Sequence, residues 1–209
     1  MFDMTAVSQP GLGDPVHQSQ EIFRAVLTAL SEPGRIMQVA GGPPASATTA
    51  LGVSEAALAV LLSLADGDTP LWLGQQSPRL AAYLRFHTGA PIVADPAAAQ
   101  FALIAAEPDH RLFDRFDTGS EDYPDRSATL IIEVAALAES GPIVLRGPGI
   151  PQHRHITIAG LPAAFPRQWT ANRALFPCGV DVILTCGTGL MGLPRTVSFE
   201  PNSAESSCM

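Results

Sequence analysis

The sequence predicts an α/β protein with a mixed sheet that is covered on both faces. Three observations predict this fold class: helical and strand patterns alternate along the chain, 46% of the residues are hydrophobic, and Gly and Pro pairs separate the patterns. At 209 residues the chain is long enough to bury one core without a second domain. We therefore expect a single domain over 1–209, with its core at about 15–199 and flexible ends at 1–13 and 200–209.

A first amphipathic helix is predicted after Asp14, a capping residue, and Pro15, which suits the first turn of a helix. Its apolar residues recur at helical spacing: Ile22, Phe23, Val26, Leu27 and Leu30. The pattern stops at the Pro-Gly pair of 33–34.

Shorter patterns predict the remaining elements. A Ser cap opens a helix at 54–65, a Ser-Pro pair opens another from 77 to about 89, an Asp-Pro pair starts a brief helical turn at 95, and a last helix is expected around 168–175. Strands are expected at 35–39, 71–73, 92–93, 101–105, 129–134, 143–145, 156–158, 180–185 and 196–199. The stretch 41–49 is interpreted as a polar connector, and 107–127 as a charged, mobile surface excursion.

The charge of the chain argues against general nucleic-acid binding. The net charge is -8 at pH 7, whereas affinity for a nucleic-acid backbone comes from neutralising phosphates with cations. Residues 1–140 carry seven Arg and seventeen acidic residues, and residues 141–209 carry five Arg and three acidic residues. We therefore look for an anion site in the C-terminal portion, whose net charge is positive.

All twelve cationic side chains are Arg, since the sequence contains no Lys. This excludes a Schiff-base lysine for pyridoxal phosphate and the phosphate-binding lysine of a P-loop, so we expect no pyridoxal phosphate cofactor. The three cysteines, Cys178, Cys186 and Cys208, lack the paired spacing of a zinc site or a redox motif. We interpret them as structural cysteines of a protein in a reducing compartment.

The N-terminal residues are not typical of a signal peptide. Asp3 stands where positive charge is needed, and no apolar stretch long enough for export follows. The longest apolar run, 56–65, is interrupted by Ser63 and is shorter than the roughly 20 residues that span a bilayer. We expect a cytoplasmic protein.

Seven short sequence words occur in a fixed order: ALSEPGRI at 29–36, LLSLADGDTPLWL at 61–73, RFHTGAPIV at 85–93, ATLIIEV at 128–134, GPGI at 147–150, FPCGVDVILTC at 176–186 and LPRTV at 193–197. Together they resemble the PhnH family of phosphonate-catabolism proteins, and the resemblance covers about 15–199. Cys178 stands where the family commonly has an apolar residue in FPxG, a small change because a thiol tolerates apolar surroundings.

The resemblance implies a place in a multi-protein complex. PhnH-like proteins join the G, I and J subunits in the core of the carbon-phosphorus lyase system. Subunits G, H and I, with the L protein, are linked to the step in which a phosphonate displaces adenine from ATP, giving a ribose 1-phosphonate 5-triphosphate; the J subunit then cleaves the carbon-phosphorus bond. The resemblance also implies a three-layer α/β sandwich related to pyridoxal-phosphate-dependent transferases, without the cofactor, and a homodimer when the protein is isolated.

Candidate anion-binding residues follow the strand predicted at 143–145. Gly147 and Gly149 of the GPGI word could let backbone N–H groups face an anion, while Arg146 supplies positive charge. Pro148 has no N–H group to contribute, and a tight turn would explain the same glycines.

Three further arginines of the C-terminal portion are candidates for an anion site: Arg167, Arg173 and Arg195. A guanidinium group can pair with two oxygens at once, which suits a triphosphate or an acidic partner, although surface arginines need no ligand. Asp181, at the start of an apolar strand, needs a partner for its charge, and an Arg or a cap is the favoured one. For His87, at a predicted helix end, capping is favoured over catalysis.

His153 and His155 are weak candidates for metal ligands, because residues two apart on a strand project from the same face. No third ligand is evident nearby, and Gln152 and Arg154 beside them favour a solvated strand end, so we expect no metal.

The sequence carries no autonomous catalytic signature, which favours a binding and scaffolding subunit that acts within a complex and is not catalytic alone. Two alternatives remain open. One is an independent nucleotide- or phosphonate-binding enzyme that uses the GPGI turn and the C-terminal arginines. The other is a metal-dependent hydrolase built on the two histidines at 153 and 155.

Overall fold

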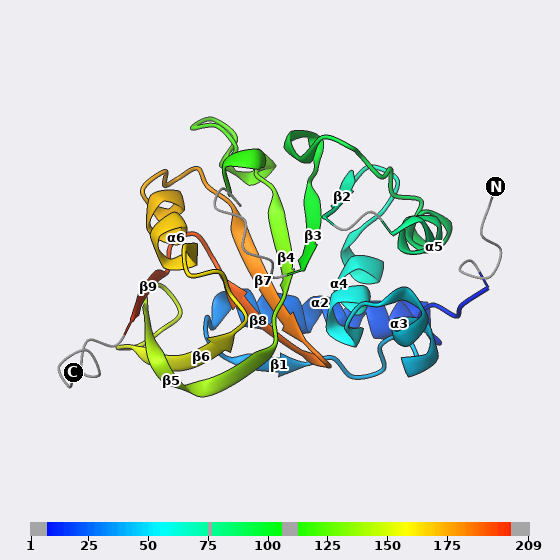
Figure 1. Cartoon of the computed structure of the whole chain (residues 1–209), viewed down its shortest axis with the longest axis horizontal. Coiled ribbons are helices and arrows are strands. Elements are labelled where there is room, and N and C mark those ends of the chain that lie inside the picture. Colours follow the sequence, from blue (N-terminus) through cyan, green and yellow to red (C-terminus); the bar gives the residue numbers. More distant parts are fainter. Residues whose placement is uncertain (1–7, 75–76, 106–112, 202–209) are drawn as a thin grey trace.

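The computed structural model describes residues 8–74, 77–105 and 113–201, which form two β-sheets and a set of helices (Figure 1). The α-helices of these residues are α2 (Pro15–Ser31), α3 (Ala45–Leu51), α4 (Glu55–Leu64), α5 (Pro78–Thr88) and α6 (Phe165–Arg173). Short 3-10 turns are η1 (Pro96–Ala98), η2 (Phe113–Arg115) and η3 (Pro124–Arg126).

The larger sheet is mixed, as predicted. Its six strands lie in the order β1 (Ile36–Gln38), β8 (Gly189–Leu193), β7 (Asp181–Cys186), β4 (Thr129–Glu133), β3 (Phe101–Ala105) and β2 (Leu71–Leu73). The last four strands of this order are parallel to one another; β8 is antiparallel to β7, and β1 is antiparallel to β8 and so runs in the direction of β7. A second, antiparallel sheet has the order β6 (Arg154–Ala159), β5 (Ala136–Arg146) and β9 (Ser198–Pro201).

Alternating side chains of the larger sheet contact two different layers. On β4, Ile131 packs into a core with α2, α4 and α5, whereas Leu130 and Ile132 pack into a second core with α6 and the smaller sheet. This period of two is the ordinary alternation of a strand that is buried on both faces. The molecule is therefore layered as helices, mixed sheet, and smaller sheet with α6 (Figure 1).

The predicted helix starts are confirmed at three positions. Asp14, Ser54 and Ser77 each accept a hydrogen bond from the backbone N–H three residues ahead, at 3.2, 3.2 and 3.3 Å, and so cap α2, α4 and α5. Helix α5 ends at Gly89, whose φ of 76° places it in the left-handed region that favours glycine. The brief turn after Asp95 is η1.

Several predicted boundaries were wrong. The stretch interpreted as a polar connector contains α3, whose Ser and Thr residues are weak helix formers. The strand expected at 92–93 is a single bridge between Ile92 and Leu71. Strand β5 is much longer than the three residues predicted, because it curves through a bulge between Ala138 and Ile143 and pairs with β6 on both sides of it.

Strand β8 and the smaller sheet were not predicted. β8 contains Gly189 and Gly192, which lower strand propensity, yet it lies in the larger sheet because α2 packs closely on it. A Cβ atom at Gly192 would stand 2.5 Å from the backbone oxygen of Ala29, so only glycine fits at this crossing. Gly192 therefore weakens the strand pattern of β8 in the sequence, but its missing side chain lets α2 pack on this strand.

The segment expected to be a mobile excursion is in part a packed loop. Residues 107–112 lie outside the described residues, but Phe113 and Phe116 are each only 5% exposed. The backbone oxygen of Asp117 accepts from Ala128 N–H at 2.8 Å, and that of Thr118 accepts from Gly179 N–H at 2.8 Å. The two phenylalanines and these bonds fasten the loop to the second core.

The two chain ends were expected to be flexible, and 1–7 and 202–209 lie outside the described residues. The segment 8–13 lies against α5. Tyr83 donates a hydrogen bond from its hydroxyl to the backbone oxygen of Pro10 at 3.0 Å, and His87 Nε2 lies 3.1 Å from the backbone oxygen of Gln9.

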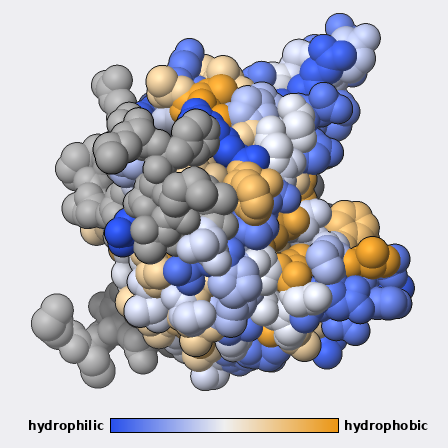
Figure 2. All heavy atoms as spheres, turned by 90° about the vertical axis from the view of Figure 1, so that its right-hand side faces the viewer, coloured by the Kyte–Doolittle hydropathy of each residue, from blue (hydrophilic) through white to orange (hydrophobic). Residues whose placement is uncertain are grey.

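Large hydrophobic side chains remain exposed at a few places. Figure 2 shows one side of the molecule, on which hydrophobic residues form several separate patches among hydrophilic ones. Among the residues that the structure describes, the exposed large hydrophobic ones are Val16, Phe23, Leu27, Phe86, Tyr123, Leu175 and Phe176. Within the described part of the chain, no single helix is long and apolar enough to cross a bilayer. Helices α3 and α4 have this length and apolar character only when they are counted together, and a bend of 94° separates them.

Candidate functional site

The GPGI word forms a tight turn after β5. Ile150 donates its N–H to the backbone oxygen of Gly147 at 3.1 Å, and Gly149 has a φ of 79°. A proline second and a left-handed glycine third are typical of a type II turn. Gly149 also packs so closely on the backbone of Ser31 that a Cβ atom would collide with it. This contact explains why the residue is a glycine without any bound anion.

The turn lies beside the LPRT word. Gly147 has a φ of 146°, and a Cβ atom there would stand 3.1 Å from the Cα of Val197 and 3.2 Å from the backbone oxygen of Thr196. The two words, which are 46 residues apart in the chain, are thus in direct backbone contact. Arg146 is exposed, and because Leu145 faces the core, Arg146 projects from the outer face of the smaller sheet.

Arg195 is held in a network within the chain. Its Nη2 lies 2.6 Å from Asp181 Oδ2, its Nε donates to Asp181 Oδ1 at 3.1 Å, and its Nη1 donates to the backbone oxygens of Pro124 and Pro177 at 3.0 and 3.2 Å. Nη2 also donates to Ser127 Oγ. All five N–H groups of the guanidinium are thereby used, and its side chain is 12% exposed. An anion at Arg195 would have to displace one of these acceptors.

The partner predicted for Asp181 is confirmed. Its carboxylate pairs with Arg195 and also accepts the backbone N–H of Arg195 at 2.7 Å. The pair joins the start of β7 to the loop after β8, which places the LPRT word.

Arg173 and Arg167 are both exposed, but α6 directs them to different hollows. Residues six apart on a helix are about 120° apart around its axis. Arg173 Nε donates to the backbone oxygen of Thr196 at 3.4 Å and lines a hollow of about 430 Å³ with Pro148, Thr170, Ala174, Phe176 and Thr196. Of the four predicted arginines, Arg173 lines this hollow beside the turn and the LPRT word.

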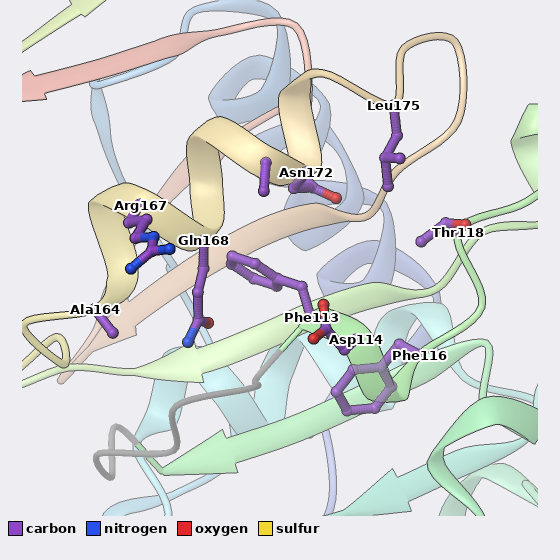
Figure 3. Close-up of a pocket in the computed structure, with 10 residues that line it drawn as sticks. Phe113, Asp114, Phe116, Thr118, Ala164, Arg167, Gln168, Asn172 and Leu175 are labelled. Carbon is purple, nitrogen blue, oxygen red and sulfur yellow. The ribbon is translucent and has the colours of Figure 1, made fainter.

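Arg167 lines a larger pocket of about 680 Å³ on the other side of α6 (Figure 3). The pocket is bounded on one side by α6 and on the other by the loop after η2; its lining residues are Phe113, Asp114, Phe116, Thr118, Ala164, Arg167, Gln168, Ala171, Asn172 and Leu175. Figure 3 shows Arg167 and Gln168 projecting from α6, on the opposite wall from Asp114 of η2 and Phe116 just after it. The pocket thus combines an aromatic wall with one charge of each sign.

The walls of this pocket are firmly held. The Phe113 ring meets Phe165 and Trp169 edge-on, with ring centroids 5.5 and 5.8 Å apart. Asn172, which is 3% exposed, donates to the backbone oxygen of Val180 at 2.9 Å and accepts the Val180 N–H at 2.8 Å. The sequence prediction missed these residues; the only signal was a pair of phenylalanines three apart in a charged stretch.

Leu175 and Phe176, which follow α6 and which we call the α6 knuckle, are exposed at 49% and 63%. Leu175 borders the larger pocket, and Phe176 borders the hollow of Arg173. Their N–H groups donate to the backbone oxygens of Asn172 and Arg173 at 3.1 and 3.2 Å, so the last turn of the helix fixes them. Adjacent exposed aromatic and aliphatic residues with arginines beside them are typical of a protein-binding surface.

His153 and His155 lie together at the start of β6, with ring centroids 5.0 Å apart and the rings edge to face. His155 Nδ1 lies 3.3 Å from the backbone oxygen of Gly141. Within 8–74, 77–105 and 113–201, no three His, Cys, Asp or Glu side chains are grouped as metal ligands.

Comparison with known proteins gives the family. Residues 10–200 match the family model described as "Bacterial phosphonate metabolism protein (PhnH)". The "Alpha-D-ribose 1-methylphosphonate 5-triphosphate synthase subunit PhnH" of Rhizobium meliloti (strain 1021) is 41% identical over 207 residues, 94% of this chain and 99% of the relative. The "Putative C-P lyase subunit protein HtxG" of Stutzerimonas stutzeri is 31% identical over 190 residues, 90% of this chain and 88% of the relative. The chain therefore belongs to the PhnH family of bacterial phosphonate metabolism proteins.

Proposed function

We propose that the protein is a subunit of the synthase that makes α-D-ribose 1-methylphosphonate 5-triphosphate, in the carbon-phosphorus lyase route of phosphonate breakdown. The observation that carries this proposal is the 41% identity to the Rhizobium meliloti synthase subunit over nearly the full length of both chains. The second relative, described as a putative carbon-phosphorus lyase subunit, points to the same pathway.

Within this complex the protein is a binding and scaffolding subunit without an active site of its own. Support comes from Arg195, the most buried arginine of the predicted anion site, which pairs with Asp181 and fixes the loop after β8. The chain has no Lys, so pyridoxal phosphate cannot be held as a Schiff base, and the protein works without that cofactor. We place it in the cytoplasm.

The finer description of the fold is also part of the proposal. A mixed six-stranded sheet between two layers is compatible with a pyridoxal-phosphate-dependent transferase fold that has lost its cofactor. Superposition of the six strands on such a transferase, in the same order and direction, is the test.

The partners are the G, I and J subunits, and the protein pairs with itself when they are absent. The α6 knuckle is the surface that meets a partner subunit. Arg167 and Arg173 flank it, in the part of the chain that carries net positive charge, so the complementary surface is apolar with acidic residues around it.

Co-expression tests this function. The chain is co-expressed with tagged G, I and J subunits, and the amount that co-purifies is measured together with growth on methylphosphonate as phosphorus source. We expect a stable complex with the unsubstituted chain, and at least a tenfold loss of co-purification for the double variant Leu175→Ser/Phe176→Ser. Phe86→Ser, at an exposed hydrophobic residue on α5, is the matched control and should assemble normally.

Two outcomes would overturn the proposal. If G, I and J assembled fully and supported growth without this chain, it would not be a needed subunit. If the isolated chain bound ATP, and Arg173→Ala abolished that binding, the independent nucleotide-binding enzyme would replace the scaffolding subunit.

A further inference from the structure

Strand β2 lies at one end of the larger sheet, and its outer side is only partly paired (Figure 1). Leu71 donates its N–H to the backbone oxygen of Pro91 at 2.8 Å, and its own backbone oxygen accepts the N–H of Val93 at 2.8 Å. These two bonds make the parallel bridge between Leu71 and Ile92, which is the first step of a further strand. The chain then turns away into η1, and among the described residues no backbone hydrogen bond continues the outer pairing at Leu73.

The backbone N–H and C=O of Leu73 point away from the sheet. The residues on either side of it in the parallel ladder bond to β3: the backbone oxygen of Pro70 accepts the N–H of Phe101 at 3.2 Å, and Gly74 donates its N–H to Leu103 at 2.9 Å. Alternate residues of such a strand bond to opposite neighbours, so Leu73 faces outward as Leu71 does. Leu73 is only 5% exposed, and backbone polar groups in buried positions normally have a partner.

A pocket of about 230 Å³ adjoins these two groups. Its walls are β2, the segment 92–94 and the start of α5, with Ser77, Pro78 and Ala81. None of the described residues that line it is charged, and the Ser77 hydroxyl already accepts the N–H of Leu80 as the cap of α5. The sheet edge therefore offers one donor, one acceptor and an apolar pocket side by side.

We propose that this β2 edge, meaning the outer backbone groups of Leu73 and the adjoining pocket, binds an extended segment of a partner subunit as an added strand. Strand addition uses main-chain hydrogen bonds for affinity and a pocket for an alternate side chain. A helix would not serve, because its backbone groups bond within the helix. The inference rests on the proposed function, since it assigns the segment to a partner subunit.

The pocket defines the chemistry of the segment. An uncharged aliphatic or aromatic side chain enters it, because a charged one would lose its hydration with no opposite charge in the wall. The residues before and after that side chain point to the other face, as in any strand. Two copies of the β2 edge cannot pair with each other, because each Leu73 lies in a hollow and needs a projecting segment.

Hydrogen exchange of the Leu73 amide tests the proposal. The rate is measured by mass spectrometry that resolves single amides, on the isolated full chain and on its complex with the G, I and J subunits. We expect the Leu73 amide to exchange at least about tenfold more slowly in the complex. The Leu71 amide is the internal reference: it is bonded to Pro91 without a partner, so its rate should change by less than about twofold.

A filled pocket should prevent this protection. Ala81→Leu places a larger side chain in the pocket, and we expect the slowing at Leu73 to fall below about twofold while the α6 knuckle still holds the chain in the complex. Ala82→Leu is the matched control, since Ala82 is the next residue of α5 but does not line the pocket, and it should keep the full slowing. Circular dichroism shows whether the variants are folded, and the measurement on the unsubstituted chain decides the proposal without them.

Three results decide against the β2 edge. Equal rates at Leu73 in the isolated chain and in the complex would show that no segment binds there. Slow exchange in the isolated chain would show that the chain closes this edge itself, and slowing that persists in Ala81→Leu would show that the pocket plays no part. If the complex forms without slowing at Leu73, the edge proposal fails and the proposed function stands; if no complex forms, both fail.

Discussion

Arg195 joins three parts of the chain that are distant in sequence. Its acceptors belong to the start of β7, to the loop at 124–127 and to the segment after α6. A guanidinium has five donors in a fixed plane, whereas the ammonium of a lysine has only three, on a group that rotates freely. The chain uses this residue as a clamp, and the position of the LPRT word depends on it.

Removing the clamp should destabilise the protein strongly. Arg195→Ala leaves the Asp181 carboxylate without its cation in a largely buried site, so we expect the free energy of unfolding to fall by about 3 kcal/mol. Arg195→Lys should recover less than half of this, since it keeps the charge but not the forked geometry. Urea unfolding measures this loss. The control is Arg146→Ala, at an exposed arginine, which should change the free energy of unfolding by less than about 0.5 kcal/mol. An unchanged midpoint for Arg195→Ala would show that the network is dispensable.

Tyr83 should make the stability sensitive to alkaline pH. Burial raises the pKa of Tyr83 to about 12 from a usual 10.0, so the folded chain keeps the phenolic proton at pH values where the unfolded chain releases it. The contribution is fully present below pH 10 and is lost as the pH rises toward 12. Tyr83→Phe lacks this loss, although it also loses the hydrogen bond to Pro10, worth about 1 kcal/mol. Urea unfolding should therefore find the variant less stable at neutral pH, with the gap narrowing above pH 10; parallel pH profiles would contradict this.

At the scale of elements, local signals were readable in the sequence and long-range ones were not. The starts of α2, α4 and α5 were predicted because a cap and its helix lie within a few residues of each other. The smaller sheet was missed because β9 pairs with β5 across about 55 intervening residues, and no short window contains that pairing. β8 was missed because its glycines are explained only by α2, which lies far away in the chain.

The candidate site shows the same limit. The sequence grouped the C-terminal arginines by their charge, but α6 directs Arg167 and Arg173 to separate hollows, and the donors of Arg195 are all bonded within the chain. Net charge along a sequence does not say which side of a helix a residue occupies. The sequence gives no sign of the α6 knuckle, because Leu and Phe residues look the same in a sequence whether they are buried or exposed.

The turn at 147–150 should be sensitive to a single methyl group. In Gly149→Ala the alanine must keep a left-handed φ, which costs about 1–2 kcal/mol. Its Cβ atom must also displace the backbone of Ser31. We expect a total loss of at least about 3 kcal/mol in unfolding free energy. Gly52→Ala is the matched control, since Gly52 has a φ of 70° but no neighbour within 4 Å and should show the backbone cost alone. Equal losses for the two variants would mean that the turn can shift at little cost.

At the scale of the whole molecule, the exposed apolar residues of α2 and of the α6 knuckle lie on different layers. Phe23 and Leu27 of α2 belong to the helical layer, and the α6 knuckle belongs to the layer of the smaller sheet, with the mixed sheet between them (Figure 1). The mixed sheet therefore separates the α6 knuckle from the exposed apolar residues of α2.

The two surfaces should therefore be separable by mutation. In Leu175→Ser/Phe176→Ser we expect co-purification with the partner subunits to be lost while self-association of the isolated chain keeps its dissociation constant. The matched variant Phe23→Glu/Leu27→Glu should still co-purify with the partners, because these residues lie on the other layer. Light scattering on size-exclusion fractions, with and without the G, I and J subunits, measures both properties on the same samples. Both surfaces are exposed and rest on separate hydrophobic cores, so neither pair of changes should alter folding or reach the other surface. If Phe23→Glu/Leu27→Glu abolished co-purification as well, the two surfaces would act as one interface with the partners.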